Sequence, residues 1–160
     1  MRRVTLLVCG DPLRGDDAVA AAVLETLPAS TLALADVRQV GQLMPDDLLG
    51  ADGPIILLDA VEGPAPGEVI DLPLASLLEA HGSGINPGSS HALPLPITLA
   101  IAERLGDGLP EGRFVGIAGS DYRIGAPLSP RVRDAVPRCA AQLNHWVRAL
   151  AHPTRVRTCA

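Results

Sequence analysis

Acidic side chains gather near the start of the chain, in the segment from Gly10 to Asp17, which reads GDPLRGDD. The apolar run Val4–Cys9 precedes this segment and has the pattern of a buried strand, and an amphipathic pattern over Asp16–Leu27 follows it. Carboxylates at such a turn can bind a cation, transfer a proton or cap a helix. Because ligands of open α/β sheets bind at the carboxyl ends of the strands, the turn is a candidate site.

The glycines of this turn do not fit a phosphate-binding loop. Gly10 and Gly15 have the spacing of the two glycines of a P-loop, in which a lysine and a serine or threonine follow the second glycine. Here Asp16 and Asp17 follow it, and the sequence contains no lysine. The dinucleotide-binding pattern G-x-G-x-x-G also fails, because Pro12 takes the place of its middle glycine. Two carboxylates would repel a phosphate, whereas they suit a cation, a proton transfer or a helix N-terminus.

Two residues further along the chain have the chemistry to complete a metal site. Asp59 ends the apolar run Pro54–Leu58, and His91 stands at the far end of a glycine- and serine-rich loop. If the sheet has the flavodoxin-like order 2-1-3-4-5, the strands before Asp17 and Asp59 are neighbours, and His91 can reach both aspartates from its loop. Two carboxylates and one imidazole suit a divalent transition metal that keeps open coordination positions.

Each candidate also has a purely structural explanation. Asp is a favoured N-cap, so Asp16 can cap the helix that follows, and Asp17 can complement the dipole of its first turn. His91 can cap the helix after its loop. Asp59 is harder to explain in this way, because an aspartate that ends an apolar strand adds little to solubility. The residues alone leave these alternatives open.

The apolar patterns predict strands that alternate with helices. The predicted strands are Val4–Cys9, Thr31–Val40, Pro54–Asp59, Glu68–Leu72 and Arg113–Ala118, of which the fourth is an antiparallel edge strand. The predicted helices are Asp16–Leu27, Met44–Leu49, Leu74–Ala80, Leu95–Leu105 and a long helix that Ser129 caps, with Pro130 as its first residue, to about Ala151. The expected fold is a three-layer α/β/α single domain over residues 1–160, with a twisted, mostly parallel five-stranded sheet and a frayed tail at 152–160.

The composition excludes several classes of partner. The 160 residues carry a net charge of −5 and only 2% aromatic residues, so neither a basic surface nor a stacking platform for nucleic acid is expected. The one basic cluster, Arg131, Arg133 and Arg138, has the spacing of an exposed helix face. No segment is long and apolar enough to span a membrane. Three cysteines far apart in the sequence favour a reducing compartment, so we expect a cytoplasmic protein. Little in the sequence suggests an obligate dimer, so a monomer is the default expectation.

Nucleophilic catalysis has little support in the sequence. No G-x-S-x-G motif is present, and neither is the H-E-x-x-H motif of zinc proteases. Cys9 lies in the first predicted strand and is expected to be buried, whereas a catalytic thiol must be exposed and activated.

Several motifs, in order, resemble the hydrogenase maturation proteases, the endopeptidases that trim the large subunits of nickel–iron hydrogenases. The motifs are GDPLRGDDAVA from Gly10, IILLDAVEGPAPGEV from Ile55, SSHALPL from Ser89, FVGIAG from Phe114 and LSPRVRDAV from Leu128. The resemblance covers Val4 to about Leu150. It implies a five-stranded sheet between helices, which agrees with the fold expected from the apolar patterns.

The resemblance also implies a site and a substrate. Asp17, Asp59 and His91 match the residues that recognise nickel already inserted in the large-subunit precursor, before a short C-terminal extension is removed. The nickel is then supplied by the substrate, and no resident cofactor is expected, although cadmium or zinc can occupy such a site. Asp16 would serve as a base or as a group that orients the others.

Two loops depart from the family pattern. The first turn is usually Gly-x-Gly-Asn, whereas this chain has Val8-Cys9-Gly10-Asp11. The second loop is usually rich in glycine and threonine, whereas this chain has Gln39-Val40-Gly41-Gln42-Leu43. Both loops are expected to border the site. Two alternatives therefore stay open beside the peptidase, namely a non-catalytic nickel-sensing chaperone of the same large subunit and a small-molecule hydrolase.

Overall fold

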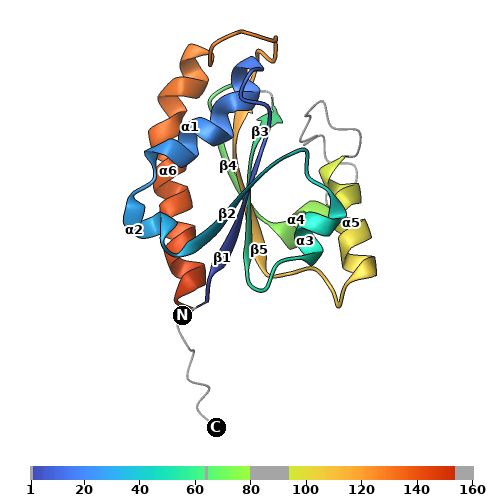
Figure 1. Ribbon diagram of the computed structural model, residues 1–160. Helices are drawn as coiled ribbons and strands as arrows, with labels where there is room; N and C mark the ends of the chain where they lie inside the picture. The colour runs from blue at the N-terminus through green and yellow to red at the C-terminus, as the bar shows by residue number, and fades with distance from the viewer. Residues whose placement is uncertain (1, 64, 80–93, 154–160) are drawn as a thin grey trace.

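A five-stranded sheet forms the centre of the protein (Figure 1). The computed structural model of the chain describes residues 2–63, 65–79 and 94–153. The strands are β1 (Val4–Cys9), β2 (Ala35–Gly41), β3 (Ile55–Glu62), β4 (Val69–Pro73) and β5 (Gly112–Gly119). Their order in the sheet is β2-β1-β3-β5-β4, and every neighbouring pair is parallel except β4 and β5. The predicted α/β class and the mostly parallel sheet are confirmed.

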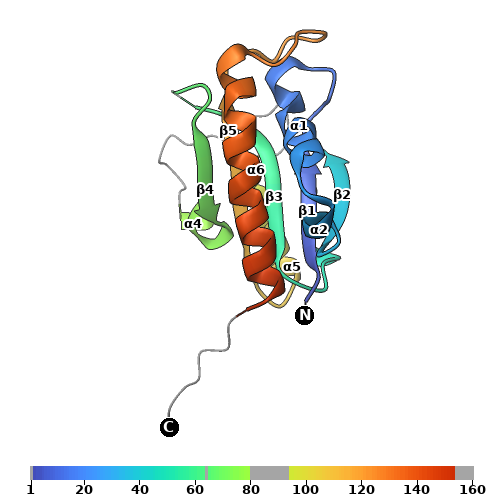
Figure 2. The ribbon, with the colours of Figure 1, turned by 90° about the vertical axis from the view of Figure 1, so that its left-hand side faces the viewer.

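Helices cover both faces of the sheet. They are the 3-10 helix η1 (Gly15–Ala18), α1 (Val19–Thr26), α2 (Ala29–Leu32), α3 (Pro45–Leu49), α4 (Leu74–Glu79), α5 (Leu95–Leu105) and α6 (Pro130–Ala151). The helices α1, α2 and α6 lie on one face and α3, α4 and α5 on the other (Figure 1). Figure 2 shows α6 running the length of the sheet beside α1 and α2. These three layers are the predicted ones.

The strand β1 is buried on both faces, as its unbroken apolar sequence predicts. Leu6 and Val8 belong to the core under α1 and α6, and Leu7 and Cys9 belong to the core under α3, α4 and α5. The alternation follows from the two-residue period of a strand. Each fully buried aliphatic side chain of this kind stabilises the fold by roughly 1.5–3 kcal/mol.

The long helix α6 is amphipathic, and its outer side is basic. Its buried residues recur at helical spacing and include Val132, Val136, Leu143 and Val147. Arg131, Arg133 and Arg138 are exposed, as predicted. Within the described ranges, no helix has both the length and the apolar character needed to cross a membrane.

The second strand begins later in the structure than the sequence predicts. Thr31–Val40 was expected to be extended, but Ala29–Leu32 is the short helix α2, and β2 begins at Ala35. Thr31 is fully buried and hydrogen-bonds to Asn144 of α6, so a contact made far along the chain overrides its strand propensity.

The far side of the sheet also differs from the flavodoxin-like order. The strand β5 pairs with β3, and β4 lies outside it as the antiparallel edge strand. The carboxylate of Asp71 on β4 accepts hydrogen bonds from Arg113 Nε at 2.7 Å, from Trp146 Nε1 at 2.7 Å and from Gln142. These partners on β5 and α6 hold β4 in place. The expected adjacency of β1 and β3 is confirmed.

Candidate functional site

The turn after β1 is fixed by close backbone contacts. Gly10 has a φ of +98°, and a Cβ there would lie 2.2 Å from the carbonyl oxygen of Asp17, so the position requires glycine. The N–H of Gly10 donates to the carbonyl of Gly41 at 2.8 Å. This hydrogen bond joins the turn after β1 to the end of β2.

Asp11 shapes the turn with its side chain and its backbone. Its Oδ1 accepts a hydrogen bond from the N–H of Leu13 at 2.9 Å, and its own N–H donates to Oδ2 of Asp17 at 2.8 Å. Asn and Asp both make this kind of side-chain turn. Aspartate in place of the asparagine of the family pattern is therefore compatible with the same local geometry.

Asp17 is buried, and one of its oxygens is unsatisfied. The side chain is 4% exposed, and Oδ1 has no hydrogen-bond partner among the described residues. Burying a charged oxygen without a partner is costly, and a cation at Oδ1 would remove that cost. The orphaned oxygen therefore marks Asp17 as a candidate metal ligand.

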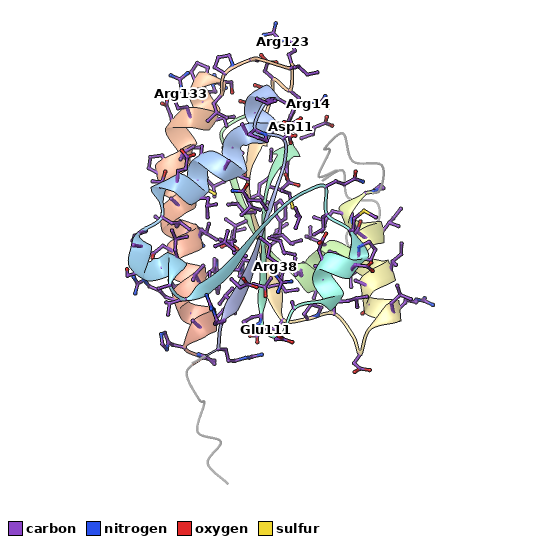
Figure 3. All side chains as sticks on the ribbon, viewed as in Figure 1. Asp11, Arg14, Arg38, Glu111, Arg123 and Arg133 are labelled. Atoms are coloured by element: carbon purple, nitrogen blue, oxygen red, sulfur yellow. The ribbon has the colours of Figure 1, made fainter. Side chains whose placement is uncertain are left out.

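Asp17 lines two cavities at the ends of β1 and β2. The first has a volume of about 370 Å³, and its other lining residues are Gly10, Asp11, Pro12, Arg14, Gly41 and Gln42. The second, of about 280 Å³, extends over Ala18 and Ala21 towards Gln39. The two loops that depart from the family pattern thus both border Asp17, as expected from the sequence. Figure 3 shows Asp11 and Arg14 at this end of the sheet, with Arg123 nearby.

Asp16 holds the loop between β5 and α6 against the turn. Its side chain is fully buried and accepts hydrogen bonds from the N–H groups of Ser120 at 2.8 Å, Asp121 at 3.0 Å and Ser129 at 2.7 Å. The hydroxyl of Ser129 donates a further bond at 2.9 Å. The N–H of Asp16 itself donates to the carbonyl of Asp121 at 2.7 Å.

The expectation that Asp16 caps its helix is therefore wrong. Arg14 occupies the N-cap position of η1, and the carboxylate of Asp16 turns away from the helix to the loop before α6. Burial alone would raise its pKa, but hydrogen bonds from Ser120, Ser129 and Asp121 outweigh burial, so the pKa of Asp16 lies below its usual value. Both oxygens of the ionised carboxylate are occupied by donors.

Asp59 lies inside β3 rather than at its end. The ladder with β5 continues from Asp59, opposite Gly116, to Glu62, so the strand extends three residues beyond the predicted end. Asp59 is 7% exposed, and its Oδ1 accepts a hydrogen bond from the N–H of Ala60 at 2.8 Å. Because β1 and β3 are parallel neighbours, Asp17 and Asp59 lie towards the same edge of the sheet.

Cys9 is buried beneath this edge, as predicted. Burial raises the pKa of the Cys9 thiol well above its usual range, and the negative charges of Asp59, Asp47 and Asp17 raise it further. A thiol held in the protonated form is a poor nucleophile. The structure gives no support to cysteine catalysis at Cys9.

Tyr122 lies close enough to the acidic residues to feel their charge, and the sequence did not single it out. Its hydroxyl donates to the carbonyl of Val61 at 2.9 Å, which joins the loop after β5 to β3. Burial raises its pKa, and so do Glu62, Asp16, Asp17 and Asp59, in that order. The one signal in the sequence that could have pointed to Tyr122 is its place in a loop after a predicted strand, because the acidic residues around it come from distant segments.

The third expected ligand, His91, lies outside the described residues, and so does His81. Within residues 2–63, 65–79 and 94–153, no three His, Cys, Asp or Glu side chains are grouped so as to hold a metal. His145 and His152 are exposed near the end of α6 and just after it. The end of α6 and the start of α1 lie at opposite ends of the sheet (Figure 1). A site made of Asp17, Asp59 and His91 stays a prediction.

The fold defined by these strands and helices is that of the hydrogenase maturation proteases. The [NiFe] hydrogenase maturation protease HybD from Thermococcus kodakarensis is 21% identical, with a TM-score of 0.72 over 91% of this chain and 99% of that chain. The hydrogenase maturating endopeptidase HybD from E. coli is 22% identical, with a TM-score of 0.71 over 91% and 92%. The hydrogenase 3 maturation protease reaches 0.64 at 21% identity, over 91% of each chain.

The sequence itself matches no family model and no curated protein. At such identities, the likeness to solved structures establishes the fold, and the activity has to be argued from the site.

Proposed function

We propose that this protein is an endopeptidase that removes a C-terminal extension from the nickel-loaded precursor of a nickel–iron hydrogenase large subunit. In this proposal Asp17, Asp59 and His91 recognise the nickel that the precursor brings. The observation that supports it most is Asp17, a residue that lines a cavity at the edge of the sheet and whose buried Oδ1 has no hydrogen-bond partner among the described residues. The solved structures that share the fold include several maturation proteases, and this favours the same role here.

The ligand set suits the proposed cargo. Carboxylate and imidazole groups bind divalent transition metals, so nickel fits, and cadmium or zinc would bind the same groups in vitro. A nickel ion held there can act in two ways. It can polarise the scissile carbonyl or activate a water molecule, or it can serve as a checkpoint that admits only the loaded precursor.

The decisive experiment compares the precursor with and without nickel. After incubation with the protein, mass spectrometry should show loss of a C-terminal peptide from the nickel-loaded precursor only. Asp59→Asn and His91→Ala should abolish this loss while the far-UV circular dichroism spectrum stays unchanged. Asp107→Asn and His152→Ala, the same changes at exposed positions, serve as controls. Normal processing by both site variants would show that the site is assigned wrongly.

Nickel binding to the isolated protein offers a second test. We expect weak binding that declines below about pH 6, where a free histidine becomes protonated and can no longer ligate a metal. Titration calorimetry at several pH values measures it. Binding that does not change with pH in this range would exclude His91 as a ligand.

One observation favours the alternative of a nickel-sensing chaperone without peptidase activity. Among the described residues near the turn, Asp16 has both oxygens occupied and Cys9 is buried with a raised pKa, so neither offers a free base or nucleophile. Under this alternative, the protein binds the nickel-loaded precursor and leaves its mass unchanged. Turnover of small esters or amides without any precursor would instead indicate a small-molecule hydrolase.

A further inference from the structure

The cavity beside Asp17 is lined by one arginine as well as by acidic residues. Arg14 is half-buried there, and its guanidinium makes no hydrogen bond or ion pair with any described residue. Asp17, which lines the same cavity, has the unpartnered Oδ1. One cavity of about 370 Å³ is thus lined by an arginine without a partner and by an aspartate with one unsatisfied oxygen, and the two do not bond to each other.

Arg14 differs from the other half-buried arginines of the described chain. Arg38 pairs with Asp36 at 2.8 Å, and Arg113 pairs with Asp71 at 2.7 Å. A guanidinium that is partly removed from water normally needs such a partner, because the lost hydration is otherwise not compensated. The missing partner of Arg14 is therefore expected to come from outside the chain.

The backbone of Arg14 is held firmly in place. Its N–H donates to the carbonyl of Asp11 at 3.1 Å, and its carbonyl accepts from the N–H of Asp17 at 3.0 Å. The next residue, Gly15, has a φ of +52°, and a Cβ there would lie 2.2 Å from the carbonyl oxygen of Asp121. The side chain thus projects from a preorganised turn, which lowers the cost of binding a partner.

We propose that Arg14 is a specificity-determining residue that binds a carboxylate of the precursor next to the nickel that Asp17 faces. The proposal rests on the proposed function. The planar guanidinium fork matches a carboxylate with two parallel hydrogen bonds. Asp11 and Asp17 repel an anion everywhere else in the cavity, so the cavity selects a substrate in which a positive metal centre and a carboxylate lie side by side.

The removal of this one charge has opposite effects on two ligands. Arg14→Gln makes the cavity more negative, so the isolated protein should bind nickel ions at least as tightly as the wild type does. The same substitution removes the carboxylate contact, so the precursor should be processed less efficiently. A residue that only supported the turn would weaken both, because its loss would displace Asp17.

The variants are compared in the precursor assay and in nickel titrations. Arg14→Gln should lower kcat/KM by about 10- to 100-fold, mainly through KM, as expected for the loss of a charge-assisted hydrogen-bonded pair. Arg14→Lys should recover part of this loss. Arg131→Gln is the matched control, because Arg131 is exposed near the start of α6, its side chain also has no partner among the described residues, and it lines neither of the two cavities described beside Asp17.

The carboxylate can belong to an Asp or Glu side chain of the precursor or to its C-terminus. Precursors with single Asp→Asn or Glu→Gln changes and a precursor with a C-terminal amide distinguish these sources. The precursor change that removes the carboxylate bound by Arg14 should reduce processing by the wild-type protein as much as Arg14→Gln does. The same precursor change should have no further effect on processing by the Arg14→Gln protein.

Three results would overturn the inference. The first is equal processing by the wild type and by Arg14→Gln. The second is that the effects of Arg14→Gln and of every carboxylate change in the precursor are fully additive. The third is weaker nickel binding together with a lower Tm for Arg14→Gln, which would assign Arg14 a supporting role. A wild-type protein that does not process the loaded precursor would instead refute the proposed function.

Discussion

Asp16 and Asp17 are neighbours with opposite roles, and the same substitution should separate them. Asp16→Asn should destabilise the fold, because Asp16 accepts four hydrogen bonds of 3.0 Å or less from Ser120, Asp121 and Ser129. Asp17→Asn should leave stability within about 1 kcal/mol of the wild type, because the amide oxygen can still accept from Asp11 and a buried, unpartnered charge is removed.

The expected loss for Asp16→Asn follows from its partners. A hydrogen bond to a charged group contributes about 1.5–3 kcal/mol. Three of the four donors contact Oδ2, so an asparagine oxygen at that position keeps three bonds, which lose their charge assistance, and its NH₂ group faces the N–H of Ser129, whose bond is lost. The free energy of unfolding should then fall by about 3–5 kcal/mol, and Tm by roughly 6–20 °C for a domain of this size.

The stability difference between the wild type and Asp16→Asn should depend on pH. The pKa of Asp16 in the folded state lies below its ordinary value, so the ionised carboxylate stabilises the fold at pH values above that ordinary pKa. As the pH falls below about 4, towards the folded-state pKa, the advantage of the wild type over Asp16→Asn should shrink. Other carboxylates titrate in both proteins and cancel in the difference.

Urea unfolding followed by far-UV circular dichroism at pH 7 and pH 3.5 measures these differences. Asp121→Asn is a control on the same loop, because the side chain of Asp121 pairs with Arg123, whose side chain is 83% exposed. A loss of less than about 0.5 kcal/mol for Asp16→Asn, which is within the range of ordinary surface substitutions, would refute the assigned role of Asp16. A difference that does not narrow at low pH would refute it as well.

Three further outcomes are expected. Gly10→Ala should lower the free energy of unfolding by at least about 2 kcal/mol, because the new Cβ would clash with the backbone of Asp17. Gly41 has a φ of +58° but free space around it, so Gly41→Ala should lower the free energy of unfolding by about 1 kcal/mol. Chemical denaturation tests both. Asp71→Asn should lower stability by about 1–3 kcal/mol and shift the fluorescence of Trp146, which donates to that carboxylate. Because the pKa of Asp71 is also lowered, this loss should diminish as the pH falls below about 4.

Local sequence was enough to predict those helices and strands that are marked by residues within them or directly before them. The unbroken apolar run gave the bounds of β1, and the pair Ser129-Pro130 gave the start of α6. The helix Leu95–Leu105 was likewise predicted with its observed bounds. The carboxylates near the edge of the sheet were also found, because they follow or interrupt apolar strands.

Contacts between distant segments were beyond local sequence. The serine at the start of α6 was expected to cap its helix, yet the Ser129 side chain donates to Asp16, 113 positions away. The register of β3 with β5 likewise extends the strand past Asp59, although an aspartate within an apolar run looks like the end of a strand. The unpaired state of Arg14 could only be recognised once its surroundings were known.

The hydrogen bonds of Asp16 determine when the acidic turn can form during synthesis of the chain. They join the first turn of the chain to the segment that begins α6, so the acidic turn is complete only after Ser129 has left the ribosome and docked. A nascent chain that ends earlier retains a carboxylate whose donors have not yet been synthesised. Such a chain is therefore expected to lack a fully formed acidic turn.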